Sequence, residues 1–177
     1  MTARTEDTAN ALRRPLSAGV EVPSGAAPAV VYDRLADLRS HTAWTGLASI
    51  EAPPGPAVAG TEFTSTGPDP MGSFADRSVV TEAVRGKVFE HVTEARLTPK
   101  RGGEPVDWTL VHRYELRPDG TGARITYTVT ITHLSATPGL LRLLRGRFAP
   151  LVMKMSAAGA RRALRRLAAT AEERSGH

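Results

Sequence analysis

The sequence predicts a single α+β domain in which an antiparallel sheet packs against a long C-terminal helix. A chain of 177 residues with 41% hydrophobic content is long enough for one well-filled core. The hydrophobic pattern alternates with a period of two from about residue 47, and it returns to a helical period after Pro138. A run of strands followed by a helix is typical of α+β domains.

The first third of the chain predicts one strand and two short helices. Residues 16–22 have a strand pattern that ends at Pro23-Ser24-Gly25. Pro28 then marks the start of a helix, because the missing N–H of proline costs nothing in the first helical turn. Residues 41–44 predict a second short turn or helix before Gly46.

The alternating segments predict six more strands, separated by glycine- and proline-containing turns. The expected strands are 48–52, 61–66, 74–84, 87–97, 106–117 and 123–133. Two turn signals define hairpins within this run. One is the two-residue turn Arg85-Gly86, and the other is the segment Pro118–Gly122.

A long helical pattern begins at Pro138 and runs nearly to the C-terminus. Pro150 lies inside it, and we expect this proline to kink or divide the helix because it removes a backbone donor. Gly159 falls on the apolar face of the same helix. A glycine there weakens the helix but lets another backbone or a ligand come close.

The positive charge of the chain is concentrated in this last segment. The net charge is +5, and residues 138–177 hold nine Lys or Arg against two Glu. We interpret these arginines as the solvated face of the helix. A nucleic-acid partner is not expected, because aromatic residues are not interleaved with the arginines and no known motif is present.

Composition excludes several other classes. There are no cysteines, so disulfides and thiolate metal sites are excluded, and a reducing, cytoplasmic location is expected. No apolar run is long enough for a membrane span. No cofactor is expected, because the sequence has no phosphate loop or metal-binding signature. We expect a disordered tail over 1–15, the domain over 16–172 and a short tail over 173–177, in a monomer or homodimer.

Several segments resemble, in their order along the chain, one known superfamily. They are Val20–Pro23 running into Pro28–Asp37, His41–Trp44, Val79–Glu82, Arg113–Thr121 and the Leu/Arg/Ala-rich terminal helix. This order resembles the START-like or SRPBCC superfamily, the helix-grip fold of polyketide cyclases, lipid-transfer domains and pollen-allergen relatives.

The resemblance covers roughly residues 16–172 and carries several expectations. It implies a seven-stranded antiparallel sheet wrapped around the terminal helix, with two short helices between the first two strands. It also implies an apolar cavity between sheet and helix that binds or transforms a hydrophobic small molecule. It supplies no catalytic residues, because the superfamily has no shared catalytic motif.

Strand alternation indicates which side chains face this cavity, since residues two apart share a face. In strand 106–117, Trp108 and every second residue on either side of it are then expected to face inward. In strand 123–133, every second residue from Ile125 to His133 is expected to face inward. We expect the cavity wall to contain Phe74, Phe89, Trp108, Leu110, Tyr114, Val129, Ile131, Phe148, Val152 and Met155.

A polar row is expected to cross this apolar face. If the last hairpin turns at Asp119-Gly120, His112 lies opposite Tyr127. A symmetric loop near residue 101 places His91 opposite His112. A slip of one residue in any strand would turn that strand's side chains outward and destroy the row.

The hairpin at Arg85-Gly86 adds two more expected pairs and two candidate carboxylates. His91 should face Val80, and Phe89 should face Glu82. In the same register Glu82 and Asp76 could point inward, where a carboxylate would be a candidate base.

Two functions remain open at this point. The first is a binding, carrier or sequestration protein for a hydrophobic molecule, with the polar row shaping the pocket. The second is a cyclase, aromatase or dehydratase in which His91, His112 and Tyr127 move protons. A metal site is not expected, because zinc needs three or four ligands and His133 lies rows away. His41 is expected to be a surface turn residue near the cavity rim.

Overall fold

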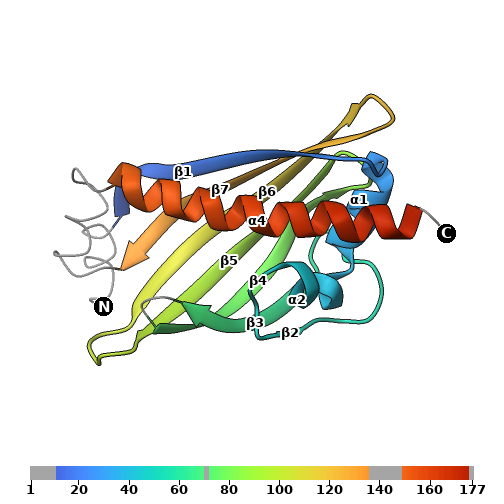
Figure 1. Cartoon of the computed structure of the whole chain (residues 1–177). Coiled ribbons are helices and arrows are strands. Elements are labelled where there is room, and N and C mark those ends of the chain that lie inside the picture. The colour runs from blue at the N-terminus through green and yellow to red at the C-terminus, as the bar shows by residue number, and fades with distance from the viewer. Residues whose placement is uncertain (1–10, 70–71, 136–148, 176–177) are drawn as a thin grey trace.

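The computed structural model describes residues 11–69, 72–135 and 149–175 and contains a seven-stranded antiparallel sheet that wraps around a long helix (Figure 1). The strand order across the sheet is β1-β7-β6-β5-β4-β3-β2. The strands are β1 (Ala11–Ser24), β2 (Ser49–Glu51), β3 (Glu62–Asp69), β4 (Gly72–Val84), β5 (Val88–Pro99), β6 (Val106–Asp119) and β7 (Gly122–Ser135). The predicted fold class is confirmed.

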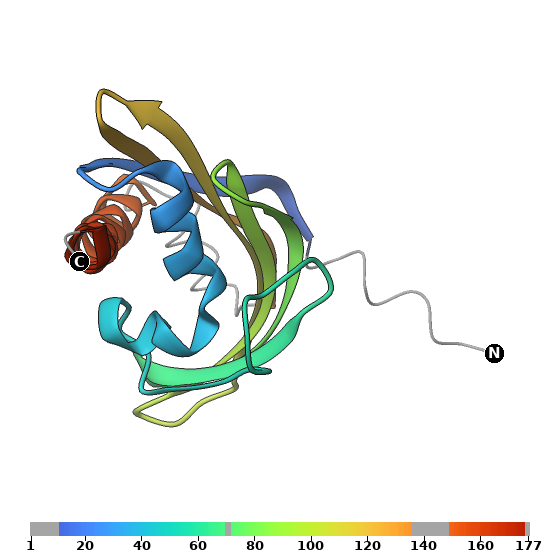
Figure 2. The ribbon, with the colours of Figure 1, turned by 90° about the vertical axis from the view of Figure 1, so that its right-hand side faces the viewer.

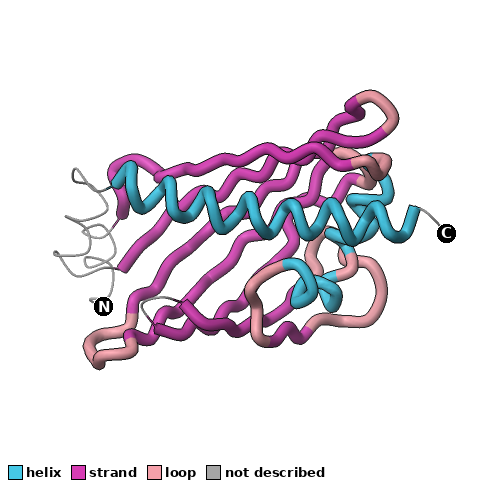
Figure 3. Tube along the Cα trace, viewed as in Figure 1, coloured by secondary structure: helices cyan, strands magenta, loops and turns pink. Residues whose placement is uncertain are grey.

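The helices of the described ranges lie on the concave side of this sheet (Figures 2 and 3). They are α1 (Pro28–Ala36), a 3-10 turn η1 (Leu38–Ser40), α2 (His41–Trp44) and α4 (Ala149–Ser175). Pro28 stands in the first turn of α1, as predicted. None of the helices in the described ranges is long and apolar enough to cross a membrane.

The ends of the elements differ from the expected domain limits. β1 begins at Ala11, five residues before the expected boundary at residue 16. α4 runs to Ser175, three residues beyond residue 172. Pro150 is the second residue of α4. The chain on its N-terminal side, residues 136–148, lies outside the described residues, so the predicted kink or division of the helix at Pro150 stays a prediction.

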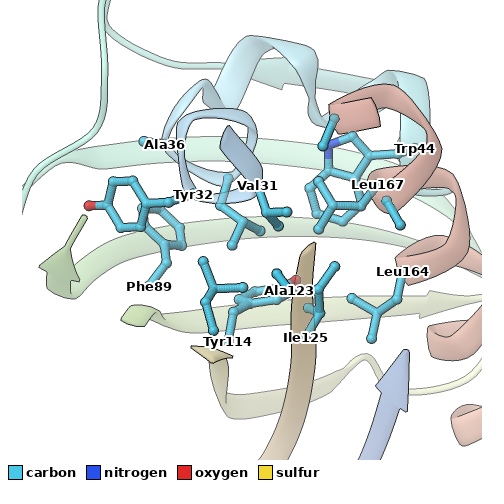
Figure 4. Packing of buried hydrophobic residues seen from close by; sticks show 14 of the residues in the cluster. Val31, Tyr32, Ala36, Trp44, Phe89, Tyr114, Ala123, Ile125, Leu164 and Leu167 are labelled. Atoms are coloured by element: carbon cyan, nitrogen blue, oxygen red, sulfur yellow. The ribbon is translucent and has the colours of Figure 1, made fainter. Parts of the chain in front are cut away.

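One end of the shell is filled by a hydrophobic core. α1 contributes Val31 and Leu35, and α4 contributes Leu164 and Leu167, which meet Ile125 of the sheet (Figure 4). All five are essentially inaccessible to solvent. Burying a side chain of this kind contributes about 1.5–3 kcal/mol, so this end holds the C-terminal half of α4 on the sheet.

Polar contacts fasten the same half of α4 to the chain that leaves β1. The backbone N–H of Gly25 donates to the Glu172 carboxylate at 2.6 Å, and the Ser24 hydroxyl donates to the same oxygen at 3.3 Å. The Arg34 guanidinium donates to the Thr170 carbonyl at 3.2 Å.

The hairpin between β6 and β7 turns one residue later than predicted, and this shifts the partner of each nearby β6 residue by two positions in β7. Asp119 pairs with Gly122, and Gly120 has a positive φ of 59° that suits glycine in a tight turn. The predicted pairing of His112 with Tyr127 is therefore wrong. His112 lies opposite Val129, and Tyr127 lies opposite Tyr114.

The β4–β5 hairpin combines a longer turn with a bulge. The turn has three residues, 85–87, and Val84 pairs with Val88. An irregularity between Val80 and Glu82 then restores the register, so His91 faces Val80 as predicted. Phe89, which lies between the turn and the bulge, faces Ala83 rather than Glu82, so that predicted pair is wrong.

A second irregularity moves one predicted inward residue. β6 and β7 shift register between Thr109 and Leu110, where Thr109 pairs with His133 and Leu110 with Ile131. The extra residue in β7 reverses the alternation, so Leu134 is fully buried and His133 is only half-buried. The prediction that His133 faces inward is wrong.

Candidate functional site

A cavity of about 690 Å³ lies between the concave face of the sheet, the segment around α2 and the middle of α4. Its walls come from β1, β3, β4, β5, β6, β7 and α4, and they are mostly apolar and aromatic. This volume falls within the range of pockets that take small organic molecules. The cavity is therefore the candidate functional site.

Most of the side chains expected in the wall do line this cavity. They are Phe74, Trp108, Leu110, Tyr114, Val129 and Ile131. Phe89 is the exception, since it is fully buried in the packed core, where its ring meets the Tyr32 ring edge-on at 6.1 Å. Phe148 lies outside the described residues, and so do the side chains of Val152 and Met155 in the first turns of α4.

The hollow exists because β3, β4 and β5 turn short side chains toward it. Ser65, Ser78 and Thr93 occupy inner-face positions and line the cavity. The Ser78 and Thr93 hydroxyls hydrogen-bond each other at 2.8 Å, so they are satisfied without filling the space. Gly67 leaves room for the cross-strand Phe74 ring, because a Cβ at Gly67 would lie 2.5 Å from it.

The polar row is present, although one of its contacts is diagonal. His91 and His112 are paired across β5 and β6, and their rings stack with centroids 4.7 Å apart. His112 Nδ1 lies 2.7 Å from the Tyr127 hydroxyl. Tyr127 is two residues along β7 from Val129, which is the residue opposite His112. That hydroxyl donates to Nδ1 when the imidazole carries its proton on Nε2. All three side chains line the cavity.

The surroundings keep this row uncharged near neutral pH. Burial lowers the pKa of His112 to about 4, and burial together with the two nearby imidazoles lowers the pKa of His91 well below its ordinary value. Burial raises the pKa of Tyr127, and it also raises that of Tyr114. The row therefore offers neutral hydrogen-bonding groups to the cavity.

His41 and Trp44 form part of the wall that sequence reasoning did not assign. His41 is only 4% exposed, so the prediction of a surface turn residue is wrong. Its Nε2 lies 2.8 Å from the Leu35 carbonyl, which can only accept, so Nε2 carries the proton. Burial lowers the pKa of His41 to about 4. The aromatic pair at residues 41 and 44, three apart on one short helix, was the available signal.

Asp76 is a carboxyl group inside the cavity wall. One of its oxygens accepts from the Ser65 hydroxyl at 3.2 Å, across the β3–β4 pair. Burial raises the pKa of Asp76 to about 6, and the bond from Ser65 lowers it only in part. The inward position considered for Asp76 is thus present in the structure, since Asp76 lines the cavity. Glu82 is not among the lining residues, and its carboxylate accepts from the Arg113 guanidinium at 2.7 Å.

Four polar atoms of lining side chains have no hydrogen-bond partner within the described part of the chain. They are Trp44 Nε1, Asp76 Oδ1, His91 Nδ1 and Trp108 Nε1. Leaving a buried donor or acceptor unpaired costs about 1–3 kcal/mol. Such a concentration around one cavity is unusual for a packed interior.

The remaining wall comes from parts of the chain whose role was not predicted. Sequence reasoning missed Leu16, Ala18, Thr45, Gly46, Leu47, Phe63, Pro68, Asp69, Ala160, Arg162, Ala163, Leu164 and Arg166 as lining residues. Gly159 was expected to let a ligand come close, but Arg162 and Arg166 were interpreted only as part of the solvated face of the helix. No group of three or more His, Asp or Glu side chains in the described ranges is arranged to hold a metal ion.

Known structures with the same arrangement are numerous. The di-domain ARO/CYC StfQ from the steffimycin biosynthetic pathway superposes with a TM-score of 0.67 at 18% identity, over 92% of this chain and 53% of StfQ. TTHA0849 from Thermus thermophilus gives 0.65 at 17% identity, over 90% and 99% of the two chains. Ara h 8.0201 gives 0.61 at 12% identity, over 90% and 99%.

These comparisons define the fold. The chain has the helix-grip fold of START-like, Bet v 1-like domains. In sequence, no protein-family model and no curated protein matches it.

Proposed function

We propose that this protein binds a hydrophobic small molecule in the cavity between its sheet and α4, as a carrier or sequestration protein. The observation that carries the proposal is the cavity itself: about 690 Å³ of space with aromatic and aliphatic walls. Moving apolar surface of a ligand from water into such a space is favourable by roughly 25 cal/mol per Å². Polycyclic, polyketide-like and lipid-like molecules all fit this description.

The unpaired atoms in the wall add a requirement on the ligand. Trp44 and Trp108 each bring an N–H donor, while Asp76 brings an acceptor when it is ionised. Each atom belongs to a side chain that lines the cavity. A ligand with oxygen or nitrogen functions would relieve the cost of the unpaired groups, so we expect an oxygenated molecule rather than a plain hydrocarbon.

The second candidate function is that of a cyclase, aromatase or dehydratase acting on a polyketide-like substrate. The contact between His112 Nδ1 and the Tyr127 hydroxyl favours it, because the pair can relay a proton. A pKa near 4 for His112 counts against it, since a general base works best with a pKa near the working pH. The likeness to StfQ supports only the fold that such chemistry would use.

Native mass spectrometry of the purified protein tests the binding proposal. We expect a co-purified small molecule, or uptake of one equivalent of an apolar probe such as N-phenyl-1-naphthylamine. A protein that carries nothing and takes up no apolar probe would contradict the proposal. A cytoplasmic location and a monomeric or homodimeric state stay predictions.

His112→Phe separates the two functions. A carrier loses only the polar contact, so its ligand affinity changes modestly and no chemistry is lost. An enzyme keeps its affinity and loses product formation from a candidate poly-β-ketone. Turnover by the wild type that persists unchanged in His112→Phe would exclude the acid–base role of this row.

A further inference from the structure

Two arginines of α4 lie in the wall of the cavity. Arg162 and Arg166 are one helical turn apart, so they project from the same side of α4. Both are exposed, yet both line the cavity. The adjoining wall residues of the helix, Gly159, Ala160 and Ala163, are small, and a Cβ added at Gly159 would meet nothing within 4 Å. The cavity is therefore open to solvent beside two guanidinium groups.

Within the described ranges, neither arginine has a carboxylate partner in an ion pair. No ion pair or hydrogen bond joins Arg162 or Arg166 to any acidic side chain in residues 11–69, 72–135 or 149–175. The carboxyl groups of the cavity, Asp69 and Asp76, belong to β3 and β4, and Asp76 is bonded to Ser65. Like charges one turn apart repel each other, so the pair weakens the helix slightly when no anion is bound.

We propose that Arg162 and Arg166 bind the anionic group of an amphiphilic ligand whose apolar part fills the cavity. Guanidinium groups match carboxylate, phosphate and sulfonate oxygens in planar, paired hydrogen bonds. Their exposure keeps the anion partly hydrated at the mouth, so the ligand avoids the cost of burying a bare charge. The inference rests on the proposed function and narrows its ligand class from hydrophobic molecules to anionic amphiphiles.

The same helix provides its own control. Arg161 and Arg165 have the same spacing and are also exposed, but they do not line the cavity. The double variants R162Q/R166Q and R161Q/R165Q each remove two positive charges and one repulsive pair from α4. Any general effect of net charge is therefore equal in the two variants, and only a local contact distinguishes them.

Two fluorescent probes that differ by one anionic group complete the experiment. N-Phenyl-1-naphthylamine is neutral, and 8-anilinonaphthalene-1-sulfonate is the same ring system with a sulfonate. We expect R162Q/R166Q to weaken sulfonate binding by about three- to tenfold, as for exposed ion pairs, with neutral-probe binding unchanged. R161Q/R165Q should bind both probes like the wild type. The sulfonate preference should shrink as salt is added.

The outcomes separate this inference from the proposed function. If the wild type binds neither probe, the cavity does not take apolar molecules and the proposed function fails. If the neutral probe binds but the two double variants lose sulfonate binding equally, or not at all, the arginine site is wrong while the proposed function stands. Equal thermal midpoints of the three proteins establish that folding is not the cause.

Competition with twelve-carbon amphiphiles then identifies the anionic group. Dodecanoate, dodecyl phosphate and dodecanol are titrated against the bound neutral probe in the wild type and in R162Q/R166Q. The proposal expects at least one of the two anions to compete several-fold better than the alcohol, with that advantage lost in the variant. Equal competition by all three molecules would overturn it.

Discussion

The two ends of the shell are built from the same strands and the same helix, but one is solid and the other is hollow. Beside α1, large apolar side chains such as Leu35, Phe89 and Ile125 are fully buried. Beyond α2, the corresponding inner face carries Ser65, Ser78 and Thr93, and several larger side chains there, such as Trp108, Leu110 and Val129, are only half-buried around open space. Side-chain size along the inner face, rather than the fold, thus decides where the domain can hold a ligand.

The largest expected effect is on the packed end. Leu35→Ala removes a fully buried side chain from between α1 and α4, and it should lower the free energy of unfolding by about 3–4 kcal/mol. Val129→Ala on the half-exposed hollow face should cost about 1 kcal/mol or less, because little packing is lost. Urea denaturation of both variants measures the difference. Equal losses would contradict the division into solid and hollow ends.

Acid should destabilise the wall of the cavity. His41 has a pKa of about 4 in the fold and 6.5 when unfolded, so only the unfolded chain binds the proton between these values. The stability from neutral His41 is full above pH 6.5 and falls with pH through this window, by up to about 3 kcal/mol below pH 4. His112 acts in the same direction.

Asp76 partly offsets this trend, since its raised pKa of about 6 makes the folded state bind the extra proton between pH 6 and 3.8. Denaturation midpoints from pH 7.5 to 4 test the balance, and His41→Phe should flatten the profile. A stability that stays constant or rises on acidification would show that these imidazoles are not held neutral.

Filling the hollow end should weaken binding more than it destabilises the fold. Ala18 lines the cavity from β1, opposite Val129, and Ala18→Phe adds a ring where there is open space. We expect at least about a tenfold loss of neutral-probe affinity, equivalent to about 1.4 kcal/mol, with a smaller change in stability. Ser17→Phe places the same ring on the outer face and is the control. Unchanged probe binding by Ala18→Phe would locate the ligand elsewhere.

The smallest effect concerns the mouth. Gly159→Ala should raise the free energy of unfolding by about 0.5–1 kcal/mol, because alanine is the better helix former and its Cβ meets nothing. Probe affinity should be unchanged, since a methyl group does not close the opening. A loss of stability, measured by thermal denaturation, would indicate that another part of the chain packs against this position.

Alternation allowed the inner face to be predicted, but register did not follow from it with the same accuracy. The turn of the β6–β7 hairpin was misplaced by one residue, so the predicted partners were wrong by two, which preserved the face of Tyr127 and kept it beside His112. The bulge in β7 adds one residue to the strand, and this reverses the alternation and turns His133 away from the inner face. Bulges depend on local twist and packing, and a single-sequence pattern does not report them.

The walls supplied by the helices were the hardest part to predict. The burial of His41 depends on the turn of chain from α1 to α2 and on a bond to the Leu35 carbonyl, which is a tertiary contact. Arg162 and Arg166 have the pattern of a solvated helix face, and only the position of α4 over the sheet makes them cavity residues. Phe89 was assigned to the wall because its strand face was right, but α1 covers it.

The location of a bound molecule is the most direct test of the hollow end. Nuclear Overhauser contacts can be measured between bound N-phenyl-1-naphthylamine and the methyl groups of a selectively labelled sample. We predict contacts to the methyl groups of Leu110, Val129 and Ile131 and none to those of Leu35 or Leu167. Contacts confined to the packed end or to the outer face of the sheet would contradict the account.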